Sequence, residues 1–120
     1  MEELIKTTNK LIALAAKTSK KPKQVVRKLM TTWIMNITSD NLIHHEDFGR
    51  YSRKAINFLA LPNYHITKSE DKWFVEDIIR AAYSYIIGDK ETVDEWIDET
   101  NKAYETWESK IDIDIDTNDN

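Results

Sequence analysis

Residues 73–87 are the stretch of this chain that most limits its possible folds. The stretch contains no Gly or Pro and is long enough for four helical turns. On a helical wheel nearly every position is apolar, apart from an arc of about 100° that holds Glu76, Asp77, Arg80 and Ser84. A helix that is apolar over most of its circumference is normally buried by several neighbours. We therefore predict that residues 69–87 form the buried central helix of a small helical domain.

The composition also favours helices over sheets. The 120-residue chain has two Gly and two Pro, which are fewer turn residues than a β-sandwich or barrel needs. Apolar residues make up 41% of the chain, an ordinary share that argues against wholesale disorder. The length fits one domain. We predict an all-α, single-domain bundle of about five helices, with residues 1–111 in the helical domain.

Apolar periodicity places three helices before the central helix and one after it. Apolar side chains recur at helical spacing over the residues 3–17, 22–37 and 45–60. Thr67 and Glu70 have the spacing of a capping box that would begin the central helix. Gly88 has the position of a C-terminal cap, and either Asp89 or Thr92 is then expected to cap a fifth helix.

The fifth helix has a narrow apolar stripe that is longer than the central helix. The stripe would be roughly 27 Å long and the central helix roughly 22 Å, so we expect the C-terminal end of the stripe to overhang. Residues 112–120 begin by alternating Asp with Ile. Asp is a poor strand former and no partner strand is predicted, so we expect a frayed, flexible acidic tail. The positions of the stripe are Val93, Trp96, Ile97, Thr100, Tyr104, Trp107 and Ile111.

The overhanging end is the predicted protein-binding surface. Exposed Trp and Tyr side chains are enriched at binding hot spots. We expect Trp73 and Trp96 to pack in the core, whereas Trp107 lies where the bundle should no longer cover the fifth helix. The residues assigned to this surface are Tyr104, Trp107, Ile111, Ile113 and Ile115.

Charge is divided unevenly between the two halves of the chain. Residues 1–60 have 11 basic and 5 acidic side chains, a balance of +6. Residues 61–120 have 6 and 16, a balance of −10, and the two balances give the net charge of −4. This asymmetry indicates either a charged partner or attraction between the halves within the folded domain.

The basic half contains candidates for nucleic-acid binding. Lys and Arg side chains can contact phosphates, and Arg and Asn can contact base edges. The simpler interpretation is an ordinary solvated helix face next to a lysine-rich loop. The candidate residues are Lys20, Lys21, Lys23, Arg27, Lys28, Arg50, Arg53, Lys54 and Asn57.

No motif in the chain indicates catalysis, a metal or a cofactor. The chain has no Cys, and its two Gly residues do not form a glycine-rich phosphate loop. His44 and His45 are adjacent, so they would not face each other on a helix, and His65 lies elsewhere. Glu76 is best explained by an ion pair with Arg80 four residues on, rather than by a catalytic role.

We therefore interpret the chain as a small non-enzymatic binding protein, an adaptor or regulator that acts through protein–protein contact. Two alternatives stay open: a nucleic-acid-binding module that uses the basic half, and an acidic mimic of nucleic acid that uses the C-terminal half. A homodimer is also open. We expect a cytoplasmic location without a membrane partner, because no signal peptide or long apolar run is present. The frequent Asn, Ile and Lys would suit a phage, a virus or an AT-rich bacterium.

Overall fold

Five helices follow one another along the part of the chain that the structure describes. The computed structural model describes the backbone of residues 1–61 and 63–118, and the side chains of these residues up to position 106. No strand occurs in this described part, which confirms the predicted all-α fold. The helices are α1 (Glu2–Ser19), α2 (Lys23–Ser39), α3 (Phe48–Ala60), α4 (Ser69–Ile86) and α5 (Lys90–Asn118).

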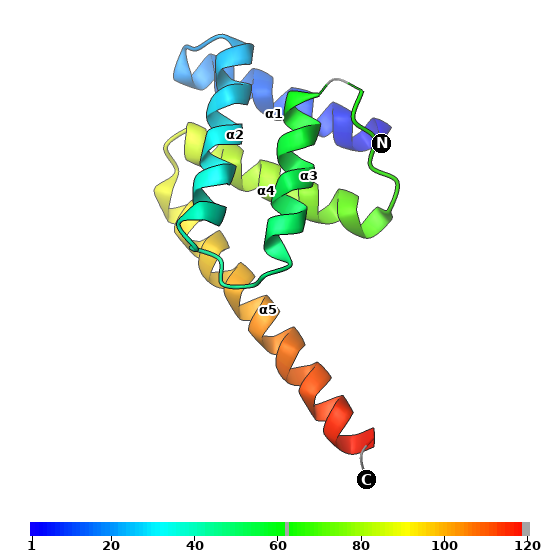
Figure 1. The fold of residues 1–120 in the computed structure, drawn as a ribbon. Coiled ribbons are helices and arrows are strands. Elements are labelled where there is room, and N and C mark those ends of the chain that lie inside the picture. Colours follow the sequence, from blue (N-terminus) through cyan, green and yellow to red (C-terminus); the bar gives the residue numbers. More distant parts are fainter. Residues whose placement is uncertain (62, 119–120) are drawn as a thin grey trace.

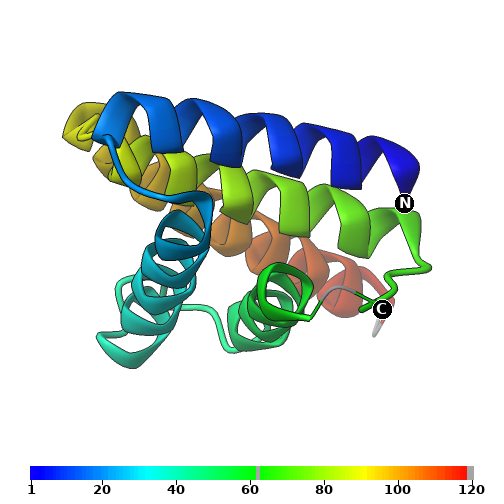
Figure 2. The ribbon, with the colours of Figure 1, turned by 90° about the horizontal axis from the view of Figure 1, so that it is seen from above.

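Helix α4 packs against each of the other four helices. Helix α1 runs alongside α4 in both views of the ribbon, while α2 and α3 cross them as an antiparallel pair (Figures 1 and 2). The core lies where these faces meet, and its fully buried side chains include Ile12, Ile34, Ile78 and Ile79. None of the described helices is long and apolar enough to cross a lipid bilayer.

One large side chain of α4 lies on the opposite side from the core. Trp73 is 62% exposed, so the prediction that it packs in the core is wrong. The physical reason is its register: Trp73 falls within the arc of the helical wheel that also holds Arg80 and Ser84, whereas Val75 and Ile79 point into the bundle. The polar arc of α4 therefore contains one exposed Trp.

Two of the predicted helix ends are confirmed and one is wrong. Gly88 has a φ of 81° and follows the last turn of α4, as a C-terminal glycine does. The Asp89 carboxylate accepts the backbone N–H of Thr92 at 3.2 Å and so caps α5. At the start of α4 the capping position is Lys68, without a side-chain hydrogen bond. The predicted capping box therefore does not form, and its Glu70 instead accepts a hydrogen bond from a tyrosine of α3.

The predicted start of the third helix was three residues too early. Residues 45–47 form a turn rather than the first turn of α3. In this turn the backbone N–H of Asp47 donates to Nδ1 of His45 at 3.2 Å. A side chain that bonds the local backbone in this way competes with helix formation.

Helix α5 projects beyond the bundle (Figure 1). The radius of gyration is 15.9 Å, larger than the roughly 13.6 Å of a compact chain of this length. The backbone of α5 is helical through Asn118, beyond residue 111 where the sequence analysis ended the domain. The expected flexibility of residues 112–120 stays a prediction, and residues 119–120 lie outside the described part of the chain.

Candidate functional site

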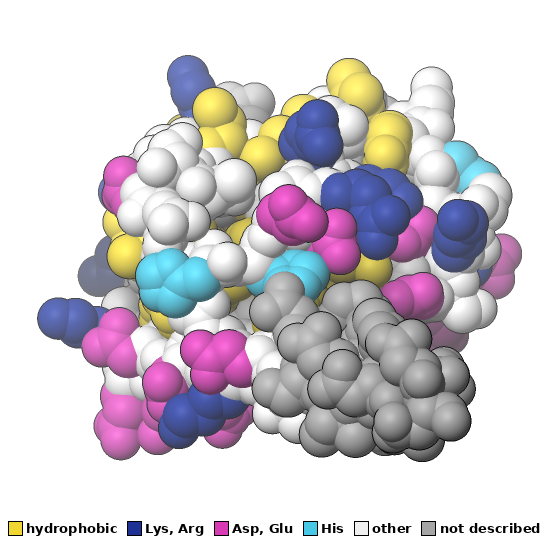
Figure 3. Space-filling model, turned by 60° about the horizontal axis from the view of Figure 1, so that its bottom comes forward, with side chains coloured by type: hydrophobic (Ala, Val, Ile, Leu, Met, Phe, Trp, Pro, Cys, Tyr) yellow, Lys and Arg dark blue, Asp and Glu magenta, His cyan; other side chains and the backbone are white. Residues whose placement is uncertain are grey.

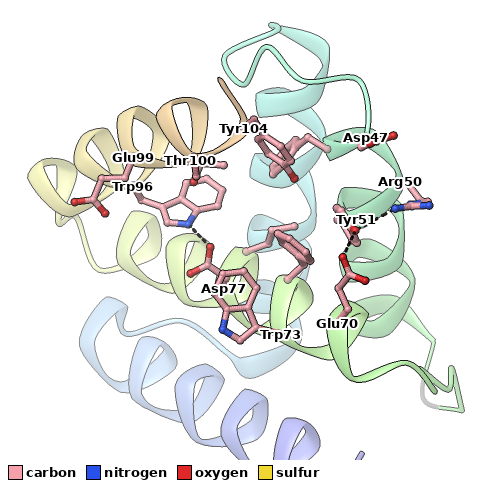
Figure 4. Close-up of a pocket in the computed structure, with 14 residues that line it drawn as sticks. Asp47, Arg50, Tyr51, Glu70, Trp73, Asp77, Trp96, Glu99, Thr100 and Tyr104 are labelled. Carbon is pink, nitrogen blue, oxygen red and sulfur yellow. Dashed lines mark hydrogen bonds between the residues drawn. The ribbon is translucent and has the colours of Figure 1, made fainter. Parts of the chain in front are cut away.

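A pocket of about 660 Å³ lies between α3, α4 and α5, and we call it the cleft (Figure 4). One face of α4 lines it with residues spaced at i, i+3, i+4, i+7 and i+8, namely Glu70, Trp73, Phe74, Asp77 and Ile78. The start of α3 contributes Asp47, Phe48, Arg50 and Tyr51. Helix α5 contributes Trp96, Glu99, Thr100, Ala103 and Tyr104. Three helices distant in sequence therefore build one concave surface.

Aromatic rings in mutual contact form the walls of the cleft. The rings of Tyr51 and Phe74 stack with their centroids 4.1 Å apart, and Trp73 meets Phe74 edge-on at 4.8 Å. The ring of Tyr104 stacks on His45 at 4.1 Å. Such pairs stabilise each other's orientation in addition to the area they bury. The walls are therefore held in place by the protein itself, while Trp73 stays 62% exposed.

Carboxylates outnumber cations in the cleft. Its lining has four acidic side chains, Asp47, Glu70, Asp77 and Glu99, and one basic side chain, Arg50. The acidic surface continues outside the cleft along α5, where the exposed side chains include Glu91, Asp94, Glu95, Asp98 and Glu105. Figure 3 shows acidic side chains gathered at the lower left of the face it views, and most visible basic side chains in the upper half. The cleft thus lies in an acidic region.

Arg50, the one basic side chain among the described lining residues, lies at one end of the cleft. Arg50 donates a hydrogen bond to the Tyr51 hydroxyl at 3.0 Å, and its guanidinium lies 4.9 Å from the centre of that ring. The Tyr51 hydroxyl donates in turn to Glu70 at 3.4 Å. Figure 4 shows Arg50, Tyr51 and Glu70 together on one side, with Asp77 and Trp96 on the other. We call these two sides the Arg50 end and the Asp77 end.

Asp77 is held in position by the indole of α5. The Nε1–H of Trp96 donates to Asp77 Oδ2 at 2.8 Å. Burial raises the pKa of Asp77 above its ordinary value, while the bond from Trp96 and the charge of Arg80 act in the opposite direction. Glu76 forms the predicted pair with Arg80 at 3.8 Å. Asp77 lines the cleft and is also close enough to Arg80 for that charge to act on its pKa.

The raised pKa of Asp77 gives a testable pH dependence. Because the folded state disfavours the charged carboxylate, the wild-type domain should lose stability as the pH rises from about 3.8 through the raised value. Asp77→Asn keeps an oxygen that can accept the Trp96 N–H and has no charge to bury. We expect this variant to be more stable than the wild type at pH 7, with the difference disappearing below pH 3.8. Urea denaturation of both proteins across this range would measure it, and a constant difference at all pH values would contradict the prediction.

Tyr104 belongs to the predicted protein-binding surface, and the structure places it in the cleft. Its hydroxyl is buried and has no hydrogen-bond partner among the described residues, and burial raises the pKa of Tyr104 to about 12. The phenol therefore stays protonated at neutral pH and keeps a proton to donate. The other members of the predicted surface are Trp107, Ile111, Ile113 and Ile115, whose side chains lie outside the described part of the chain.

The candidate nucleic-acid residues lie in different surroundings. Lys54 donates to Asp71 at 2.6 Å, and Arg27 donates to the Asn9 side chain at 3.0 Å and to the Leu59 carbonyl at 3.3 Å. Arg50 lies in the cleft, at the opposite end of α3 from the turn that joins α1 to α2 (Figure 1). Asn57 is partly buried. The exposed members are Lys20, Lys21, Lys23, Lys28, Arg50 and Arg53.

The histidines identified from the sequence do not gather into a metal site among the described residues. No group of three or more His, Asp or Glu side chains in that part of the chain has an arrangement that would hold a metal ion. His45 is buried and stacks on Tyr104, whereas His44 and His65 are exposed. His45 therefore contributes to packing, and His44 and His65 lie on the surface.

A scan of protein-family models, a search of curated proteins and a search of solved structures each found no match to this chain. The geometry and charge of the cleft are therefore the basis on which a function can be assigned.

Proposed function

We propose that this chain is a small non-enzymatic binding protein that takes a segment of a partner protein into the cleft between α3, α4 and α5. The observation that carries this proposal is that Trp73 lines a pocket of about 660 Å³ and is itself 62% exposed. Binding sites are typically concave and largely apolar, with a few polar groups that converge on them. An exposed Trp at such a site has the properties of a binding hot spot.

A polypeptide segment suits this site because the cleft adjoins a longer surface. Thr100 and Tyr104 of α5 line the cleft, and the same helix then projects past the bundle. A segment seated in the cleft would continue along the projecting turns, as a peptide does in a groove beside a helix. Those turns include Trp107 and Ile111, so the predicted binding role of the C-terminal end of α5 is part of this proposal.

Nucleic-acid binding is the second candidate function. The observation that favours it is that Lys20, Lys21, Lys23 and Lys28 are all exposed near the turn between α1 and α2. Three other candidates, Arg27, Arg50 and Lys54, already donate hydrogen bonds within the domain. Fewer cations are thus available for phosphates than the sequence suggested. We prefer protein binding because the cleft combines a concave shape with an exposed aromatic ring.

Trp73→Ala tests the proposed function. Partners captured from lysate by the immobilised chain would be identified and their affinities for purified variants measured. Loss of a hot spot costs about 2 kcal/mol or more, so we expect the affinity to fall roughly 30-fold. The stability of the domain should change little because the ring is mostly exposed.

Tyr85→Ala is the matched control for that experiment. Tyr85 is also an exposed aromatic side chain of α4, at 50%, but it does not line the cleft. We expect this variant to bind partners as the wild type does. Equal binding by the Trp73 variant would contradict the proposed use of the cleft. Capture that disappears on nuclease treatment would favour the nucleic-acid candidate instead.

A further inference from the structure

Only some carboxylates of the described residues have a Lys or Arg partner, and those of the cleft are not among them. Outside the cleft, carboxylates of Asp71, Glu76 and Asp98 each lie within 4 Å of a Lys or Arg nitrogen. Among the described residues, none of the four cleft carboxylates has such a partner, and the one cleft arginine bonds to a tyrosine hydroxyl. Asp47 lies 3.9 Å from Nδ1 of His45, a nitrogen that already accepts the Asp47 backbone N–H. Negative charge in the cleft is therefore not balanced by a Lys or Arg partner among the described residues.

The aromatic lining also favours a cation. The faces of Trp, Tyr and Phe attract a cation that lies within about 6 Å of the ring centre, and Trp does so most strongly. At the Asp77 end, Trp73 and Trp96 both line the cleft beside the carboxylate (Figure 4). A positively charged side chain seated there would meet an indole and a carboxylate together.

Arg50 shows how a guanidinium fits this kind of lining. It lies over the ring of Tyr51 and donates to the hydroxyl of the same residue, next to Glu70. The Asp77 end has the corresponding groups, an exposed aromatic side chain in Trp73 and an acceptor in Asp77, and none of the described cations lines it. Arg80, the basic residue closest to Asp77 along α4, pairs with Glu76 and does not line the cleft.

We propose that the cleft recognises an arginine side chain of the partner segment, with its guanidinium bound between Trp73 and Asp77. This inference rests on the proposed function and names the chemistry of the partner. Arginine fits better than lysine because its planar guanidinium stacks on aromatic faces and has five donors, which can serve a carboxylate and a second acceptor at once. A lysine ammonium is a compact, strongly hydrated charge and makes less use of an indole face.

Three synthetic peptides test the proposal on the full chain. They share one sequence of Leu and Ala around a central position, which holds arginine, lysine or citrulline, the neutral analogue of arginine. Binding is followed through Trp fluorescence and by calorimetry. Hydrogen bonds to charged groups contribute about 1.5–3 kcal/mol, so the arginine peptide should bind roughly tenfold to a hundredfold more tightly than the citrulline peptide. The lysine peptide should fall between them.

Two matched variants test whether Asp77 is the carboxylate that binds the arginine side chain. Asp77→Asn should bring the affinities for the arginine and citrulline peptides close together. Glu76→Gln makes the same chemical change at the neighbouring residue, which pairs with Arg80 outside the cleft, and should keep the arginine preference. The preference should also decrease with added salt, because charge is its source.

The outcomes separate this inference from the proposed function. Equal binding of the arginine and citrulline peptides, or an unchanged preference in the Asp77 variant, would overturn arginine recognition. If the arginine and citrulline peptides bound equally and Trp73→Ala abolished the binding of both, the cleft would still be a peptide site and the proposed function would stand. Absence of binding of the arginine peptide at millimolar concentration would also overturn the inference, whatever partner the chain captures from lysate.

Discussion

Trp96→Ala should lower the free energy of unfolding by about 3–5 kcal/mol, the usual cost of deleting a large aromatic side chain from a packed site. The centroid of its ring lies 6.1 Å from those of Trp33 on α2 and Phe48 on α3, and its Nε1–H donates to Asp77 on α4 at 2.8 Å. One side chain thus connects α5 to three other helices. Its loss would open a cavity and leave the partly buried carboxylate without its donor. Urea denaturation followed by circular dichroism measures the change.

One further variant separates packing from hydrogen bonding, and a second compares another position on α5. Trp96→Phe keeps an aromatic ring but has no N–H for Asp77, so we expect a smaller loss, of about 1–3 kcal/mol. Trp107→Ala should lower the free energy of unfolding by less than Trp96→Ala does, because Trp107 lies on the part of α5 that is predicted to overhang the bundle. A loss of less than about 1 kcal/mol for Trp96→Ala would contradict its role in holding α5 to the bundle.

Lys54→Met should destabilise the domain by about 1.5–3 kcal/mol, because it removes the charged donor of a partly buried ion pair and leaves its carboxylate without that partner. Lys54 Nζ lies 2.6 Å from Asp71 Oδ2 and joins α3 to α4. The side chain of Asp71 is 9% exposed and that of Lys54 is 28% exposed. Methionine retains most of the length of the lysine stem, so the main effect is an uncompensated carboxylate in the interior.

A second substitution and an exposed pair serve as controls. Adding Asp71→Leu to Lys54→Met should recover much of the lost stability, because an apolar pair of similar size replaces a buried ion pair at little cost. Lys102→Met removes the cation of an exposed pair with Asp98, at 2.9 Å, and should change stability by less than about 1 kcal/mol. Equal effects of the two Lys→Met variants would show that burial of the Asp71 pair is unimportant.

The Asp71 pair also bears on the nucleic-acid hypothesis. From the sequence, Lys54 was grouped with Arg50 and Arg53 as one basic face of a helix. In the folded domain Lys54 donates a hydrogen bond to Asp71, and Arg50 donates one to Tyr51 in the cleft. Moving either side chain to a phosphate would break an interaction within the domain. Arg53 remains exposed, so a charge change there tests nucleic-acid binding with the least structural disturbance.

The sequence by itself determined the helices and several of their ends. Apolar spacing identified all five helices, and the properties of single residues set local boundaries: Gly88 adopts a positive φ, and Asp89 caps α5. Glu76 pairs with Arg80 as their spacing predicted. These features depend on residues at most four positions apart, so their physical causes are contained in a short stretch of chain.

The tertiary structure decided which helix faces meet and therefore where the candidate site lies. Glu70, Trp73 and Asp77 share one face of α4, and that spacing was present in the sequence. Their importance depends on α3 and α5 lying against the same face, and on pairs such as Trp96 with Asp77 that are 19 positions apart. Periodicity shows which side of a helix is apolar, but it does not specify the neighbouring helix. For this reason Trp73 was assigned to the core and the cleft was not foreseen.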